Sequence, residues 1–234
     1  ENGSVIKERV LKKYPILKDS KYLIQGGLAG FQAQTIKPYL SELISKEKIP
    51  FTVSGGVDRF CFDNKNIRYM GDKYQTAYID KDCGLSSSKL DFYMEPKVVV
   101  AGMTKILETV FVEEPLGLGV GIYAIHNIKS VVEGYFLSAI LNSRFINNYF
   151  TEKFKDKALA GGYLAINKNT IEKIPFIEPS DEVKENLANF SNEIHKLKIV
   201  NPKADTKALE NEIDQIVYKL YSLTPEEIEI VENS

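Results

Sequence analysis

The sequence contains only two cysteines and two histidines among its 234 residues. Cys61 and Cys83 have no Cys-x-x-Cys spacing, so we expect neither a disulfide framework nor a cysteine-based zinc site. His126 and His195 have no third residue at a spacing suited to a metal site or a catalytic triad. These shortages argue against a metal centre and against histidine-based catalysis. The cysteine usage alone fits a protein of the reducing cytosol.

Long apolar runs are also missing from the sequence. The longest uncharged stretches, residues 22–36 and 115–128, are shorter than the ~20 apolar residues that span a bilayer. No basic-then-apolar leader opens the chain. We therefore expect a soluble, cytoplasmic protein with no membrane partner. Because the sequence begins with Glu1 and not with methionine, we also expect a fragment of a longer protein.

The sequence has no excess of one charge sign, because 30 Lys and Arg stand against 32 Asp and Glu, for a formal charge of −2. A hydrophobic content of 44% is ordinary for a globular protein. The charge is unevenly distributed: residues 1–50 carry nine basic and five acidic side chains, residues 51–180 fifteen of each, and residues 181–234 six and twelve. Any anion-binding surface is therefore expected within the first 180 residues.

Short runs rich in β-branched and aromatic residues alternate with glycine and Asx turns over the first 130 residues, which predicts strands. The expected strands are residues 22–25, 51–53, 59–62, 67–70, 97–101, 109–112 and 121–126. Helical patterns are expected at residues 5–13, 37–45 and 134–150, and Pro38 suits the first turn of the second of these. The sequence thus predicts a mixed α/β fold, with a twisted mixed β-sheet and flanking helices.

The pattern becomes purely helical after Pro179. Ser180 can cap a helix whose apolar residues recur at spacings of four and three, and a second helix with the same spacing ends at Leu220. Thr224 to Glu227 has the composition of a capping box for a short last helix. We expect an antiparallel helical pair, and we divide the chain into a domain of residues 1–180, with a connecting helix in residues 1–20, and a helical segment of residues 181–234.

The helical pair of residues 181–221 has two interpretations that the sequence leaves open. It can be a brace that packs against the rest of the chain, or a docking surface for another domain or subunit. Deletion of residues 181–234 distinguishes them, because loss of a brace prevents folding whereas loss of a docking arm leaves a folded module.

Two patterns resemble catalytic motifs. Gly117 to Gly121 has the GxGxG form of a nucleotide-binding loop, but a strand follows it where such a loop would open a helix, so we interpret it as a turn. Asp80, Glu95 and Lys97 stand in the order found in metal-dependent nucleases. Charges in solvated turns explain these three residues better, and a self-contained Mg²⁺-dependent nuclease is kept as the less favoured alternative.

The segment from residue 54 to residue 74, SGGVDRFCFDNKNIRYMGDKY, combines glycine turns, arginines, lysines and aromatic residues. Arginine can bind guanine through two hydrogen bonds, lysine neutralises phosphates, and glycine allows close approach of the backbone. This mixture suits loops that contact DNA. The alternative is a polar hairpin at the edge of a sheet.

Three stretches together resemble the TaqI-like C-terminal specificity domain, which is the target recognition domain of adenine-N6 DNA methyltransferases and of fused type II restriction–modification enzymes. The first is SGGVDRF followed by IRYMGDKY. The second is AILNS at residues 139–143, followed by LAGGYLAIN at 159–167 and IEKIP at 171–175. The third is IDQIVYKLYSLTPEE at residues 213–227. The resemblance covers roughly residues 24 to 232.

The resemblance implies a module that recognises a short sequence in double-stranded DNA for an upstream methyltransferase domain or subunit. Neither the S-adenosylmethionine loop nor the Asn-Pro-Pro-Tyr-type tetrapeptide of the family's catalytic domain occurs in this chain. We therefore expect no catalytic residue and no cofactor here. S-adenosylmethionine, and Mg²⁺ where a nuclease is fused, are expected for the catalytic domains. A half-repeat of a type I restriction specificity subunit is the main alternative.

The resemblance and the composition together select the expected DNA-binding residues. Arg59 and Arg68 are predicted to contact base edges and the lysines to contact phosphates. Because little positive charge remains in excess, the isolated chain is expected to bind DNA weakly and with a steep dependence on salt. The complete set of candidates is Gly55, Gly56, Asp58, Arg59, Lys65, Arg68, Tyr69, Lys73, Lys105, Gly161, Gly162 and Tyr163.

Overall fold

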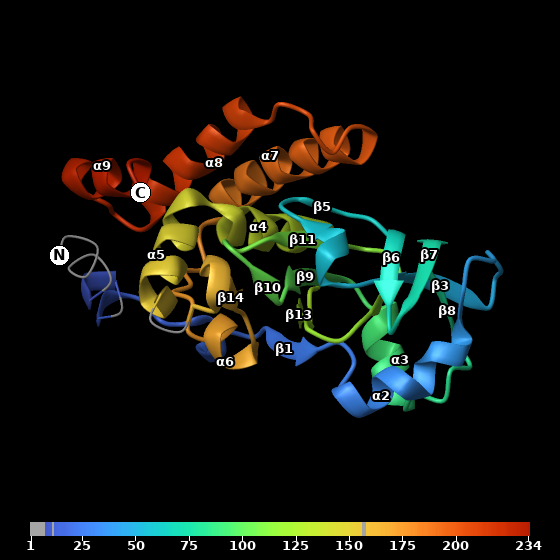
Figure 1. Cartoon of the computed structure of the whole chain (residues 1–234). Helices are drawn as coiled ribbons and strands as arrows, with labels where there is room; N and C mark the ends of the chain where they lie inside the picture. The colour runs from blue at the N-terminus through green and yellow to red at the C-terminus, as the bar shows by residue number, and fades with distance from the viewer. Residues whose placement is uncertain (1–7, 11, 156–157) are drawn as a thin grey trace.

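A computed structural model describes residues 8–10, 12–155 and 158–234 (Figure 1). It has a mixed α/β fold with several small sheets and a helical C-terminal region, which confirms the expected fold class. Much of the connecting helix expected at residues 1–20 lies outside the described residues. Arg9, within a short helical stretch, forms two hydrogen bonds with the Glu227 carboxylate at the other end of the chain, at 2.6 and 2.8 Å.

The central sheet has four antiparallel strands in the order β1-β13-β9-β11. Every residue of β9 and β11 is buried, which explains their β-branched composition. Alternate residues of β9 face two different cores, with Val98 and Val100 on one side and Val99 and Ala101 on the other. The strands are β1 (Leu23–Gly26), β9 (Lys97–Ala101), β11 (Thr109–Val112) and β13 (Ile122–His126).

A second four-stranded sheet, in the order β12-β3-β8-β2, packs beside the central one. Of two small hairpins, β6–β7 packs with this second sheet, whereas β4–β5 lies against β9 and β11 of the central sheet. A further two-stranded sheet joins distant parts of the chain by pairing β10 with β14. The strands are β2 (Leu40–Ser41), β3 (Lys48–Thr52), β4 (Val57–Asp58), β5 (Cys61–Phe62), β6 (Lys65–Tyr69), β7 (Asp72–Thr76), β8 (Tyr78–Asp80), β10 (Met103–Thr104), β12 (Gly117–Leu118) and β14 (Leu164–Ala165).

Helices cover both cores. In Figure 1, α2 and α3 lie beside the second sheet, and α4, α5, α7 and α8 gather at the opposite end. The helices are α2 (Gly30–Ile36), α3 (Ser87–Met94), α4 (Val131–Asn142), α5 (Arg144–Phe154), α6 (Lys168–Ile171), α7 (Asp181–Val200), α8 (Lys207–Leu220) and α9 (Pro225–Glu232). Within the described part of the chain, none of them is long and apolar enough to cross a bilayer.

The helical region after residue 180 follows the sequence pattern closely. The Ser180 side chain accepts a hydrogen bond from the Val183 amide and caps α7, and Thr224 and Glu227 form the expected capping box of α9. The chain reverses after α7, so α7 and α8 run antiparallel and pack side by side (Figure 1). The expected helical pair is therefore confirmed.

One helix prediction was wrong, and a second was right in type but not in continuity. Residues 37–45 do not form a helix: α2 ends at Ile36, one 3₁₀ turn follows, and β2 then pairs with β8 because Leu40 is buried opposite Ile79. The stretch 134–150 forms two helices, α4 and α5. Ser143 separates them, since its hydroxyl donates to the Ile140 carbonyl and accepts from the Ile146 amide as the cap of α5.

Candidate nucleic-acid interface

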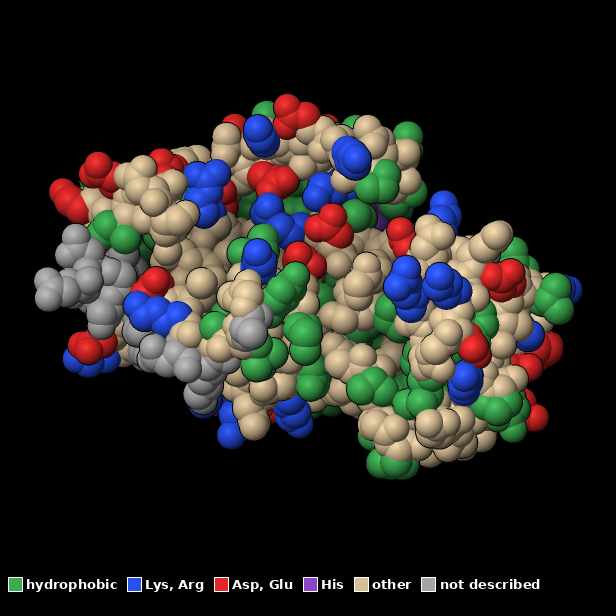
Figure 2. Space-filling view, viewed as in Figure 1, with side chains coloured by type: hydrophobic (Ala, Val, Ile, Leu, Met, Phe, Trp, Pro, Cys, Tyr) green, Lys and Arg blue, Asp and Glu red, His purple; other side chains and the backbone are tan. Residues whose placement is uncertain are grey.

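The hairpin of β6 and β7 carries two of the predicted DNA-binding cations. Ile67 and Tyr69 point into the core, so the intervening Arg68 is exposed, and Arg68 lies directly opposite Lys73 of β7. Neither side chain forms a hydrogen bond or an ion pair with any described residue. Like charges placed opposite one another destabilise a sheet. The arrangement is therefore unfavourable until an anion approaches, and Figure 2 shows basic side chains gathered over β6 and β7.

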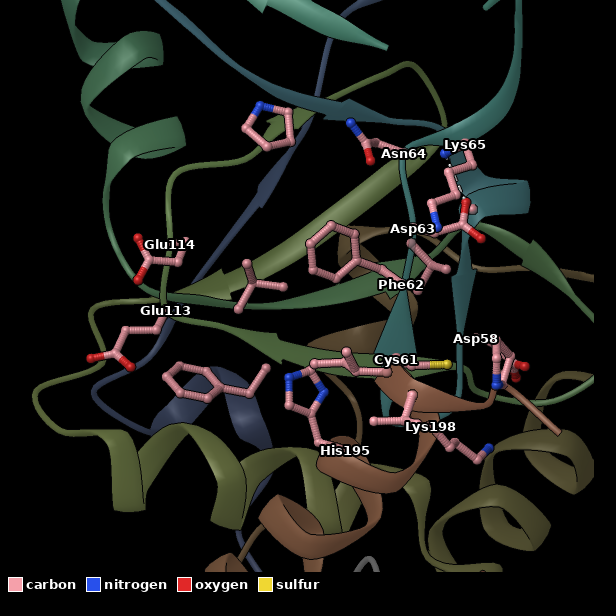
Figure 3. A pocket seen from close by; sticks show the side chains of 18 of the residues that line it. Asp58, Cys61, Phe62, Asp63, Asn64, Lys65, Glu113, Glu114, His195 and Lys198 are labelled. Atoms are coloured by element: carbon pink, nitrogen blue, oxygen red, sulfur yellow. Dashed lines mark hydrogen bonds between the residues drawn. The ribbon is translucent and has the colours of Figure 1, made fainter. Parts of the chain in front are cut away.

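Lys65 stands at the other end of β6 and lines a cleft of about 740 Å³ between residues 55–65 and the C-terminal part of α7. Figure 3 shows His195 and Lys198 of α7 on one side of this cleft and the strand carrying Cys61 on the other. Carboxylates also line the cleft, so it presents both charge signs. The acidic and basic lining residues are Asp58, Asp63, Lys65, Glu113, Glu114, His195 and Lys198.

Gly55 and Gly56 occupy a 3₁₀ turn before β4. They differ in the space available for a side chain. A Cβ atom on Gly56 would lie 2.3 Å from the Thr52 hydroxyl and 2.7 Å from the Asp63 carbonyl, so packing alone explains that glycine. A Cβ atom on Gly55 would meet nothing within 4 Å. Packing therefore does not explain why residue 55 is a glycine. Because Gly55 has no side chain, its backbone is accessible at the surface.

Arg59 is engaged by the protein itself. Its Nη2 atom donates to the Asn142 carbonyl at 2.8 Å and forms an ion pair with Glu210 of α8 at 2.7 Å. The Arg59 backbone amide donates to the carboxylate of Asp58, another predicted site residue. In this conformation the guanidinium joins α4 to α8 and is not grouped with Arg68, so the structure gives no support to a base-reading position for Arg59.

The Arg59–Phe60 turn is held by two side chains of α7 that the sequence analysis missed. His195 Nδ1 donates to the Phe60 carbonyl at 2.7 Å, and Lys198 Nζ donates to the Arg59 carbonyl at 3.0 Å. Burial lowers the pKa of His195, which suits a neutral imidazole in a structural hydrogen bond. No spacing in the sequence connects residues so far apart, so these contacts had no sequence signal.

Tyr69 is a core residue. It is 5% exposed, its hydroxyl donates to the Ala33 carbonyl at 3.1 Å, and its ring packs edge-on against Phe51. Burial raises the pKa of Tyr69 to about 12. The structure therefore places Tyr69 beneath the basic hairpin and not on its surface. The alternation of Ile67, Arg68 and Tyr69 was the sequence signal that assigns Tyr69 to the inner face.

Lys105 and Tyr163 form a second cluster near β10 and β14. Lys105 Nζ lies 5.7 Å from the centre of the exposed Tyr163 ring, within the range of a cation–π contact. Gly161 and Gly162 precede Tyr163 with φ of 82° and 78°, a left-handed conformation that other residues rarely adopt. These two glycines are thus explained by the turn, which presents the aromatic ring and the cation together.

The two clusters are connected through the backbone beside the 3₁₀ turn. The Ser54 hydroxyl accepts a hydrogen bond from the Gly102 amide at 3.1 Å, immediately before β10, and the Gly102 carbonyl accepts from Ile166 after β14. Among the predicted residues, Gly56 and Arg59 are half-buried and Tyr69 is buried, whereas the others are exposed: Gly55, Asp58, Lys65, Arg68, Lys73, Lys105, Gly161, Gly162 and Tyr163.

The three residues of the nuclease alternative, Asp80, Glu95 and Lys97, are not grouped in the described part of the chain. Lys97 is fully buried and its Nζ donates to the Tyr93 carbonyl at 2.9 Å, so its interpretation as a solvated turn charge was wrong. Burial lowers the pKa of Lys97 to about 8. Glu95 contacts His126 Nδ1 at 2.7 Å, and Asp80 lies in the other sheet. Among the described residues, no three His, Cys, Asp or Glu side chains are grouped to hold a metal ion.

The GxGxG stretch begins as a strand and turns only at its end, so the predicted turn is confirmed in part. Gly117 begins the two-residue strand β12, Gly121 has φ of 76°, and the chain continues as β13. A Cβ atom on Gly117 would lie 2.8 Å from the Ile79 side chain. Packing and turn geometry thus account for Gly117 and Gly121.

Glu108 is half-buried next to Asp58 and close to Arg59 and Lys198. Burial, together with the Asp58 charge, raises the pKa of Glu108 to about 7. A carboxyl whose pKa is higher in the folded chain than its ordinary value of 4.5 binds protons more strongly when folded. The free energy of unfolding should therefore fall as the pH rises from about 4.5 to 7. Thermal melts across this range should show that Glu108→Gln weakens the dependence, whereas Glu113→Gln at an exposed position should not.

Comparison with known proteins identifies the fold. No family model and no curated protein matches the sequence. Among solved structures, the chain is similar to part of the type IIG restriction endonuclease BpuSI, with a TM-score of 0.52 and 14% identity over 95% of this chain and 34% of that one.

Two further structures complete the comparison. The type IIL restriction–modification enzyme MmeI, in complex with DNA, has a TM-score of 0.52 and 8% identity over 91% of this chain and 34% of its own. The HsdS subunit from Thermoanaerobacter tengcongensis has a TM-score of 0.32 and 10% identity over 94% of this chain and 51% of its own. The chain spans about a third of the length of BpuSI and MmeI. It therefore has a fold that also occurs within restriction–modification enzymes.

Proposed function

We propose that this chain is the DNA-recognition module of a restriction–modification enzyme and supplies no catalytic group itself. The observation that carries the proposal is the exposed β6–β7 hairpin, on which Arg68 and Lys73 stand opposite one another without a side-chain partner among the described residues. A two-stranded ribbon fits the major groove of B-form DNA, and phosphates provide the anions that two adjacent cations need. The fold shared with parts of BpuSI and MmeI supports this assignment.

The exposed candidates have different roles in this proposal. The planar guanidinium of Arg68 matches the O6 and N7 acceptors of guanine, whereas Lys65, Lys73 and Lys105 supply point charges for phosphates. The open backbone at Gly55 allows close approach to the duplex. Arg59, bound to Asn142 and Glu210, acts as a positioning residue for its turn.

The chemistry belongs to a domain outside this chain. The resemblance to TaqI-like specificity domains favours an upstream adenine-N6 methyltransferase that uses S-adenosylmethionine as methyl donor, with the adenine turned out of the stack. Extruding a base costs a few kcal/mol of stacking and pairing. Contacts made by the recognition module help to offset that cost and fix the enzyme over one sequence.

The double variant Arg68→Ala/Lys73→Ala tests the DNA-binding surface. Each phosphate contact contributes about 0.9 to the slope of log affinity against log salt. We expect the variant to bind a mixed-sequence duplex at least tenfold more weakly at low salt and to lose between one and two from that slope, depending on how many of the two residues contact phosphate. Fluorescence anisotropy of a labelled duplex measures both quantities.

The control variant is Lys207→Ala/Lys219→Ala, which removes the same charge from exposed positions of α8. It should leave both affinity and slope close to those of the unaltered chain. Equal losses in the two variants would show that net charge and not the hairpin determines binding, and unchanged binding in the first would refute the proposed surface. With a known target, Arg68→Ala should relax one position of the site, whereas Lys73→Ala should weaken all sequences alike.

A further inference from the structure

The tip of the β6–β7 hairpin has an unusual residue for its conformation. Tyr69 pairs with Asp72, so Met70 and Gly71 form a two-residue turn, with φ of 48° and 89°. Positive φ at both positions defines the type I′ turn, which is dominated by Asn, Asp and Gly. Gly71 satisfies this requirement without strain, but methionine is disfavoured at the first position. The turn alone therefore does not explain Met70.

The Met70 side chain is not needed for the core either. Ile67 and Tyr69 are the buried residues of β6, whereas Met70 is 38% exposed at the end of the ribbon. A Cβ atom built on the neighbouring Gly71 would meet nothing within 4 Å, so the turn has open space on that side. An apolar side chain in a disfavoured conformation is thus presented at the end of a basic ribbon.

The tip is also held firmly from below. Lys37 Nζ donates to the Met70 carbonyl at 3.0 Å and forms an ion pair with Asp72 at 3.1 Å. Lys37 therefore neutralises the one acidic residue of the hairpin and fixes both sides of the turn to the end of α2.

We propose that Met70 is an apolar wedge that inserts at a base step of double-stranded DNA while Arg68 and Lys73 hold the flanking backbone and base edges. The proposal rests on the proposed function and specifies how the hairpin engages its target. In proteins that bind the minor groove, Met, Leu, Phe and Ile side chains that enter between base pairs unstack and kink the duplex. The wedge inferred here acts by the same unstacking but enters from the major groove, where the ribbon places Arg68 and Lys73. Pyrimidine–purine steps unstack most easily. The inferred site therefore contains such a step under the hairpin tip, and its deformability contributes to sequence choice.

The experiment compares Met70→Asn and Met70→Gly with Met70→Leu in the full chain. Asn and Gly suit the left-handed turn, so their melting temperatures should equal or exceed that of the unaltered chain, and Leu keeps an apolar wedge. The DNA is a duplex enriched by the unaltered chain from a randomised pool, with 2-aminopurine placed at each pyrimidine–purine step in turn. Fluorescence of this base rises when it unstacks.

The unaltered chain and Met70→Leu should raise the fluorescence at one step, and Met70→Asn and Met70→Gly should abolish that rise and bind about tenfold more weakly. Unstacking and affinity that persist in stably folded Met70→Asn or Met70→Gly would overturn the wedge while leaving the proposed function intact. If the unaltered chain enriches no duplex from the pool, the proposed function fails, and the wedge fails with it.

Discussion

A chain that ends at residue 180 is expected not to fold. The helix α4 is buried on all sides, since every residue from Phe136 to Asn142 is buried. One side of α4 packs against α7. Tyr135 packs on the His195 ring and Phe136 beneath the Lys184 ammonium of α7. Exposing each large apolar side chain lowers the free energy of unfolding by ~1.5–3 kcal/mol. The whole free energy of unfolding of a domain is only about 5–15 kcal/mol.

The deletion removes more than the cover of α4. Glu210, His195 and Lys198, which hold the Arg59–Phe60 turn, are lost with it, and Asp214 no longer accepts from the Arg144 amide at the start of α5. The apolar residues that α7, α8, α9 and the connecting loops bury are Leu187, Ala188, Ile194, Ile213, Val217, Tyr218, Tyr221 and Val231. Circular dichroism and a thermal melt of residues 1–180 should show no cooperative transition.

Val200→Ser in the full chain is the control, because Val200 is 87% exposed at the end of α7 and its loss should leave the melt unchanged. A stably folded fragment of residues 1–180 would instead show that residues 181–234 are a docking arm for another subunit. The packing of α7 on α4 favours the brace, and the division of the chain at residue 180 stays a prediction until this fragment is made.

The parts of the fold that the sequence predicted well are those decided by local pattern. The strands at 97–101, 109–112 and 121–126 match β9, β11 and β13 because runs of β-branched residues are suited to burial on both faces. The capped helices after Ser180 match because apolar spacing and capping side chains agree along the chain. Errors arose where a distant partner decides the structure: Leu40 forms a strand because Ile79 lies opposite it.

The candidate site shows the same limit. Alternation along β6 predicts that Arg68 faces away from Ile67 and Tyr69, and the structure agrees. No local pattern shows that Arg59 meets Glu210 across 151 positions of the sequence, and composition alone therefore grouped Arg59 with Arg68. Residue types near a turn suggest DNA contact. Only the tertiary structure shows which cations already form ion pairs within the protein and which stay exposed.

Asn142→Ala is expected to destabilise the chain by roughly 1–3 kcal/mol, since the buried Thr109 amide loses its partner. The Thr109 carbonyl keeps a hydrogen bond from the Phe60 amide at 2.8 Å. The side chain of the fully buried Asn142 accepts from the Thr109 amide at 3.1 Å and donates to the Thr109 carbonyl at 2.8 Å. Together with the Phe60 amide, which also donates to the Thr109 carbonyl, it satisfies Thr109 at the free edge of β11 as another strand would. Urea unfolding monitored by circular dichroism measures the change.

Asn148→Ala is the matched control, because the same deletion on α5 removes a half-buried amide that makes no hydrogen bond with the described residues. Asn142→Asp is a second test, because it keeps the size of the side chain and one acceptor oxygen. Its other oxygen faces the Thr109 carbonyl in place of a donor, so this variant should be destabilised as well. Near-normal stability of both Asn142 variants would mean that the bond to β11 contributes little. If both variants are destabilised, two residues of the AILNS stretch have structural roles: Asn142 binds the edge of the sheet, and Ser143 caps α5. The part of this stretch in DNA recognition is then limited to the hydrogen bond that the Asn142 carbonyl accepts from Arg59.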